Sequence, residues 1–83
     1  MIVTGSLESN DCMITLTPAT SFSVYLESVV KDAYGAHIEA LIETICQAHG
    51  LKHYSVRCQD QGALDATIEA RLHEAIARVQ ADA

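Results

Sequence analysis

Apolar and polar residues alternate along several segments of the chain, in the pattern typical of strands with one buried face. The alternation covers residues 12–17, 21–27 and 53–58, and Pro18 ends the first of these runs. We predict that the first two segments pair as an antiparallel hairpin and that residues 2–7 add a further strand. The side chains predicted to face the core are Cys12, Ile14, Leu16, Phe22, Val24, Leu26, Tyr54, Val56 and Cys58.

Two longer segments repeat apolar residues at spacings of three and four, which is typical of amphipathic helices. Ser28 is expected to cap the start of the first helix, which ends near Gly50, a residue suited to the left-handed turn after a helix. Asp60 is expected to cap the second helix. The predicted buried stripes are Val30, Ala33, Tyr34, Ile38, Leu41, Ile42 and Ile45 in the first helix, and Leu64, Ile68, Leu72, Ala75, Ile76 and Val79 in the second.

The element order is therefore β-β-β-α-β-α, which predicts an α+β fold in two layers. Each strand has one apolar face and each helix one apolar stripe, so both helices are expected to pack on one face of a single sheet. We expect a mostly antiparallel sheet of three to four strands. No repeat, low-complexity tract or linker divides the chain, so residues 1–83 are expected to form one domain.

Composition and charge narrow the range of partners. The 83 residues are 49% hydrophobic and 19% charged, as in a folded chain with one modest core. Eleven acidic residues against five basic ones give a formal net charge of -6, which argues against nucleic acid as a partner. The acidic surface either favours encounter with basic rims of larger proteins or simply maintains solubility.

The cysteines and histidines do not form a recognisable metal or redox motif. Cys12, Cys46 and Cys58 are widely spaced, without a Cys-x-x-Cys pair, and are expected to act as small buried hydrophobes. No His-x-x-x-His spacing occurs among His37, His49, His53 and His73, so no metal site is expected.

The chain carries no sequence signal for export or for a membrane span. Its first residues lack the basic region and the long apolar run of a secretory signal. No stretch approaches the roughly 20 apolar residues that cross a bilayer. We therefore expect a reduced, cytoplasmic protein without a membrane partner.

Residues 5–11 (GSLESND) form a short polar turn between two apolar stretches and place Ser9 beside residues that favour turns. Neither a Gly-x-Ser-x-Gly elbow nor a Ser-x-x-Lys motif surrounds this serine. The sequence thus favours a serine that another protein modifies over one that acts as a catalytic nucleophile. An ordinary turn serine is the alternative.

Three stretches of the chain resemble the citrate lyase acyl carrier protein (gamma chain) family, in order and at similar spacing. They are residues 5–11, residues 26–35 (LESVVKDAYG), and residues 62–65 (GALD) followed by residues 70–72 (ARL). The chain departs from the family pattern at Asn10, where Gly or Ser is common, and at Gln61, where a Lys often stands.

The resemblance implies that Ser9 bears a covalent, phosphodiester-linked 2'-(5''-phosphoribosyl)-3'-dephospho-CoA arm. Glu8 and Asp11 would then be recognition contacts, or groups facing a metal, in the complex with the prosthetic-group transferase. The alternative roles are a solvated side chain for Glu8 and a turn residue for Asp11. Ser6 occupies the family's Ser/Thr position and is expected to support the turn.

The resemblance further implies a carrier subunit that catalyses nothing by itself. The alpha chain of citrate lyase would exchange acetyl for citryl on the arm, and the beta chain would release oxaloacetate, so that citrate is cleaved to acetate and oxaloacetate. Two alternatives stay open. One is a carrier subunit of the malonate decarboxylase type, and the other is a small regulatory or ligand-binding β/α domain without a covalent cofactor.

Overall fold

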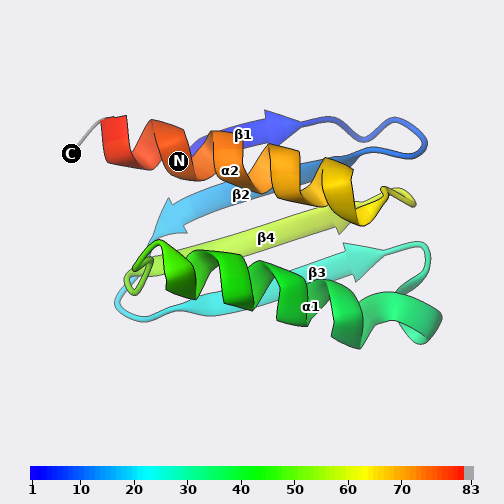
Figure 1. Ribbon diagram of the computed structural model, residues 1–83, viewed down its shortest axis with the longest axis horizontal. Helices are drawn as coiled ribbons and strands as arrows, with labels where there is room; N and C mark the ends of the chain where they lie inside the picture. The colour runs from blue at the N-terminus through cyan, green and yellow to red at the C-terminus, as the bar shows by residue number, and fades with distance from the viewer. Residues whose placement is uncertain (82–83) are drawn as a thin grey trace.

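The computed structural model describes residues 1–81 and consists of a four-stranded sheet with two helices on one face (Figure 1). The expected order β-β-β-α-β-α and the two-layer α+β architecture are confirmed. The last two positions of the expected domain 1–83 lie outside the described residues. The elements are β1 (Ile2–Gly5), β2 (Cys12–Pro18), β3 (Ser23–Ser28), α1 (Lys31–Ala48), β4 (Tyr54–Asp60) and α2 (Asp65–Ala81).

The sheet is mixed, with the strand order β1-β2-β4-β3. Strand β2 pairs antiparallel with β1 and with β4, whereas β3 and β4 are parallel. The predicted hairpin of the segments 12–17 and 21–27 is therefore wrong, because β4 lies between β2 and β3. Alternation determines which face of a strand is buried but not which strand is its neighbour. Helix α1 supplies the long crossover that a parallel pair requires.

The strand faces are buried as the alternation predicts, and the helical stripes differ at their first residues. Cys12, Ile14 and Leu16 have no exposed surface, whereas Tyr34 and Leu64 are 59% and 76% exposed. The prediction that Ala33, Tyr34 and Leu64 face the core is wrong. Leu64 precedes α2, and the buried stripe of α1 passes through Gly35. The helix residues that are buried are Gly35, Ile38, Ile42 and Cys46 in α1, and Ile68, Leu72, Ala75 and Ile76 in α2.

Neither predicted N-cap caps a helix. Strand β3 extends through Ser28, and α1 begins at Lys31 without a side-chain cap. The Ser28 hydroxyl donates to Asp60 Oδ2 (2.7 Å), and Asp60 Oδ1 accepts the Ala63 N–H (2.9 Å). Because Asp60 is only 1% exposed, its carboxylate needs these partners, and the pair joins the ends of β3 and β4 instead.

The predicted end of the first helix at Gly50 is confirmed. Gly50 has a φ of +70° and donates its N–H to the Gln47 carbonyl (3.0 Å). The next N–H, of Leu51, reaches the Cys46 carbonyl (3.0 Å). These two bonds form a Schellman motif, which closes α1 and turns the chain towards β4.

Three connections lie at the same end of the molecule: the β1–β2 turn, the β3–α1 connection and the β4–α2 connection (Figure 1). Strands β1, β3 and β4 all finish at this end, and both helices begin there. Within residues 1–81, neither helix is long and apolar enough to cross a membrane.

Candidate functional site

The turn that carries Ser9 begins at Gly5, and any other residue at this position would require the neighbouring backbone to move. Gly5 has a φ of +81°, and a Cβ at this position would lie 1.9 Å from the Cys12 carbonyl oxygen. The Ser6 N–H donates to that same carbonyl (3.2 Å), and the Asp11 N–H donates to the Glu8 carbonyl (3.1 Å). The backbone segments on the two sides of the turn are therefore in direct contact.

Asp11 organises the turn from inside. Its Oδ2 accepts the Ser6 hydroxyl (2.7 Å), and its Oδ1 accepts the Cys12 N–H (2.7 Å). The Nε–H of Arg71 in α2 donates to Oδ1 (3.0 Å), and its Nη2–H donates to Oδ2 (2.9 Å). These bonds, those from Arg71 most of all, lower the pKa of the Asp11 carboxyl from 3.8 to about 2. Asp11 therefore has the geometry of a turn residue, and Ser6 supports the turn as expected.

A second anchor ties the turn to the β4–α2 connection. The Asn10 N–H donates to the Gln61 carbonyl (2.8 Å), and the Gln61 N–H donates to the Asp11 carbonyl (2.9 Å). Asn10 itself has a φ of +65°. This conformation is rare except at Gly, Asn and Asp, which explains how Asn stands where the family often has Gly.

Ser9 lies exposed between these anchors, next to the exposed Glu8. Within residues 1–81 its side chain forms no hydrogen bond, whereas the Ser6 hydroxyl is engaged by Asp11. A catalytic serine needs a base within hydrogen-bond reach, and among residues 1–81 no side chain, that of the adjacent Glu8 included, forms a hydrogen bond with the Ser9 hydroxyl. The arrangement suits a hydroxyl that is presented to another protein.

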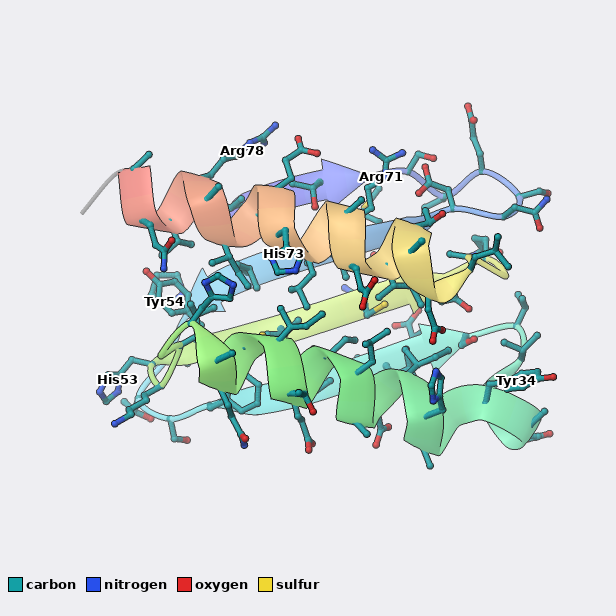
Figure 2. The ribbon with its side chains drawn as sticks, viewed as in Figure 1. Tyr34, His53, Tyr54, Arg71, His73 and Arg78 are labelled. Atoms are coloured by element: carbon teal, nitrogen blue, oxygen red, sulfur yellow. The ribbon has the colours of Figure 1, made fainter. Side chains whose placement is uncertain are left out.

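Arg71 is the site residue to which sequence reasoning gave no role, although it stands in one of the three family-like stretches. Its partner Asp11 is 60 positions away, so no local spacing reveals the pair. Figure 2 shows Arg71 on α2 beside the β1–β2 turn. The fold brings all three family-like stretches to the end of the molecule where Ser9 lies (Figure 1).

The cysteines are buried free thiols, as predicted. Burial raises the pKa of Cys46 to about 11, and a hydrogen bond with the Cys12 thiol, together with burial, raises the pKa of Cys58. In the described part of the chain, no group of three or more His, Cys, Asp or Glu side chains has an arrangement that could hold a metal ion. His37 instead pairs with Asp65 (2.7 Å), and the rings of His49 and His73 meet edge to face at 5.3 Å.

Comparison with known proteins identifies the family. The family model described as malonate decarboxylase delta subunit (MdcD) matches residues 1–79. The citrate lyase acyl carrier protein of Streptococcus equi subsp. equi (strain 4047) is 44% identical over 78 residues, which cover 92% of this chain and 76% of that protein. The chain belongs to the citrate lyase acyl carrier protein family. As a member, it is an acyl carrier and not a catalytic subunit.

Other relatives agree. The citrate lyase acyl carrier protein of Lacticaseibacillus casei (strain BL23) is 43% identical over 75 residues, covering 89% of this chain and 74% of that one. That of Treponema denticola is 34% identical, covering 92% and 87%. A solved chain from a Pseudomonas malonate decarboxylase hetero-tetramer in complex with malonate has the same fold, with a TM-score of 0.81 and 18% identity over 93% of this chain and 80% of that one.

Proposed function

We propose that the Ser9 hydroxyl is the attachment point of a phosphoribosyl-dephospho-CoA arm, and that the chain is the acyl carrier subunit of citrate lyase. The observation that carries this proposal is the exposed, unengaged hydroxyl of Ser9 at the tip of a turn whose two sides are fixed. The family membership supports a covalently carried group, and the position of Ser9 supports this serine as its site.

Attachment requires only that the carrier present an oxygen atom. The Ser9 oxygen attacks an activated phosphate held by a transferase, so that a new O–P bond forms and the bond from phosphorus to its leaving group breaks. The hydroxyl proton passes to a base of the transferase. Glu8, exposed beside Ser9, is the residue we assign to contact with the transferase, while Asp11 acts by holding the turn.

The carrier contributes a tether. When bound, the arm supplies a thiol that carries acetyl or citryl groups between the alpha and beta chains of citrate lyase. The turn fixes the origin of the arm at one end of the molecule, clear of the sheet and helices (Figure 1). Tethering replaces encounters in solution with a high effective concentration at each active site.

Intact-mass measurement tests the attachment, using protein from a host that contains the enzymes that make and transfer the arm. We expect one adduct on the unaltered chain and none on Ser9→Ala. Ser6→Ala retains the adduct, because Ser6 only supports the turn, and so does Ser21→Ala, a matched control at an exposed position. An unmodified chain from that host, or an adduct on Ser9→Ala, contradicts the proposal.

A carrier for malonate decarboxylase is the second candidate, because the matching family model bears that description. The two are separated by adding the arm-bearing carrier to the catalytic chains of each enzyme. We expect citrate cleavage with citrate lyase chains and no malonate decarboxylation with the others. The reverse result assigns the carrier to malonate decarboxylase.

A further inference from the structure

An apolar groove opens at the end of the molecule where Ser9 lies. It runs between the first half of α1 and the β4–α2 connection, with a volume of about 500 Å³. Such a volume is within the range of roughly 300–1,000 Å³ typical of small-molecule sites. Its apolar lining comes from Val30, Tyr34, Ile38, Ala63 and Leu64.

The groove begins where the Ser9 turn is anchored. Gln61, which holds Asn10 and Asp11 through backbone bonds, immediately precedes Gly62, which lines the groove. A Cβ on Gly62 would lie 3.7 Å from Asn10 Oδ1, so the residue next to Ser9 lies close to Gly62 at one edge of the groove. An arm on Ser9 would therefore start near the Gly62 edge of the groove.

The lining combines exposed apolar surface with a polar pair. Leu64 and Tyr34 are 76% and 59% exposed, which leaves apolar surface facing water. Figure 2 shows Tyr34 at this end, directed away from the sheet. His37 Nε2 and Asp65 Oδ2 meet at 2.7 Å on the groove and can hydrogen-bond to amide groups. The pantetheine segment of a CoA-type arm has this mixed character, since its amides alternate with methylene and methyl groups.

We propose that this groove is the resting site of the carrier's own arm, and that it covers the pantetheine segment and its thioester between visits to the catalytic chains. The inference rests on the proposed attachment at Ser9. Covalent tethering selects this occupant, because the arm reaches the groove from its own attachment point and is held there at a high effective concentration, at which weak affinity suffices.

Two other grooves fit the arm less well. One of about 440 Å³ is lined by Glu8 of the Ser9 turn and by Arg71 and Arg78. It is polar, and both guanidinium groups are already paired with carboxylates, so it offers little apolar surface for the methylene and methyl groups of pantetheine. Another of about 310 Å³, lined by Phe22 and Leu51, lies at the connections of the opposite end (Figure 1).

The reactivity of the arm thiol tests the inference. The arm-bearing carrier, verified by intact mass, is mixed with a coloured disulfide reagent, and its rate is compared with that of free pantetheine. Cys12, Cys46 and Cys58 have no exposed surface, so the fast reaction reports on the arm. We expect the tethered thiol to react about three times more slowly than the free one, as for an arm that rests in the groove two thirds of the time.

Leu64→Asp should restore the free rate, because a carboxylate opposes an apolar occupant. Leu7→Asp is the matched control: Leu7 is also exposed, at 51%, and lies two residues from Ser9 without lining the groove. We expect Leu7→Asp to leave the slow rate unchanged. Equal effects of the two variants would overturn the inference, since a nearby charge alone would then explain the change.

Amide NMR shifts give an independent readout. Shifts at Tyr34, Ala63 and Leu64 on addition of the arm, with Phe22 and Leu51 unmoved, support the groove. A thiol that reacts at the free rate with these amides unmoved overturns it, as do shifts that arise only when a catalytic chain is added. A chain that carries no adduct by mass contradicts the attachment at Ser9 itself, so the two failures are distinct.

Discussion

At the scale of single residues, a few contacts hold the two ends of the Ser9 turn in place. Gly5 admits the Cys12 carbonyl, and Asp11 gathers the Ser6 hydroxyl, a backbone N–H and the Arg71 guanidinium. Ser9 takes no part in these contacts and is held by its neighbours. Residues that never touch the arm should therefore control how well Ser9 is presented.

Replacement of Gly5 by alanine should destabilise the protein by more than about 2 kcal/mol, because a left-handed conformation costs an L-residue roughly 1–2 kcal/mol before any clash. The clash here is with the Cys12 carbonyl at 1.9 Å. Gly50→Ala is the matched control, since Gly50 has a φ of +70° and nothing within 4 Å of an added Cβ. Urea unfolding measures both free energies, and equal losses would show that the close approach is unimportant.

Replacement of Arg71 by methionine should raise the pKa of Asp11 from about 2 towards 3.8. Because the folded pKa lies below the usual value, the stabilisation by this carboxylate is present above about pH 3.8 and is lost as the pH falls from there through about 2. The variant should therefore be less stable than the unaltered chain at neutral pH, and the gap should narrow in acid. Carboxyl NMR titration and urea unfolding at several pH values measure the two effects.

Arg78→Met is the control for Arg71→Met. Arg78 also pairs with a carboxylate, that of Glu74, but both side chains are about half exposed. An exposed pair contributes little to stability, so we expect almost no change in unfolding and none in the Asp11 titration. An Asp11 pKa that stays low without Arg71 would mean that Ser6 and the Cys12 N–H hold it alone.

At the scale of elements, periodicity predicted what each segment becomes and which side it buries. Alternation gave the inward residues of β2 and β4 correctly, and Gly50 ended α1 where expected. The spacing of three and four was wrong at the start of each predicted helical stripe. Tyr34 and Leu64 stand at suitable spacings, yet both side chains are exposed and line the groove. Their place in the groove explains why apolar residues occur there.

Leucine-to-alanine substitutions at Leu72 in α2 and at Leu64 before α2 should differ in their effect on the free energy of unfolding, because only Leu72 lies in the core. Leu72 is fully buried, so Leu72→Ala should cost about 2–5 kcal/mol. Leu64 is 76% exposed, so Leu64→Ala should change the free energy of unfolding by no more than about 0.5 kcal/mol. Urea unfolding of both variants checks this, and a large loss at Leu64 would place it in the core after all.

Asp60 joins strands β3 and β4 to the β4–α2 connection, so its replacement should also affect the Ser9 turn. Asp60→Ala leaves the Ala63 N–H and the Ser28 hydroxyl without their partner, at a cost of roughly 1–3 kcal/mol for an unsatisfied buried group. The β4–α2 connection also holds Asn10 through Gln61, so hydrogen exchange at the Asn10 amide should quicken. Glu43→Ala, on the exposed side of α1, should change neither.

At the scale of the whole molecule, the sequence could predict the layers but not the arrangement of strands. The insertion of β4 between β2 and β3 depends on the crossover by α1, which no local pattern encodes. The same holds for the site. Ser9 could be recognised from a contiguous motif, whereas the Asp11–Arg71 pair and the groove join residues that meet only after folding.

The net charge of -6 gives a final prediction for encounters with partner proteins. Glu8 lies exposed beside Ser9, whereas Glu43 is exposed on the helix α1. If Glu8 contacts the transferase, Glu8→Gln should lower kcat/KM for arm transfer by about tenfold, as for loss of one charge-assisted hydrogen bond.

Glu43→Gln changes the net charge equally and should have only a small effect through long-range steering. The small effect should vanish at high salt while that of Glu8→Gln persists in part, because screening weakens distant charges most. Equal losses in the two variants, abolished together by salt, would mean that the overall charge guides the encounter and that Glu8 makes no contact.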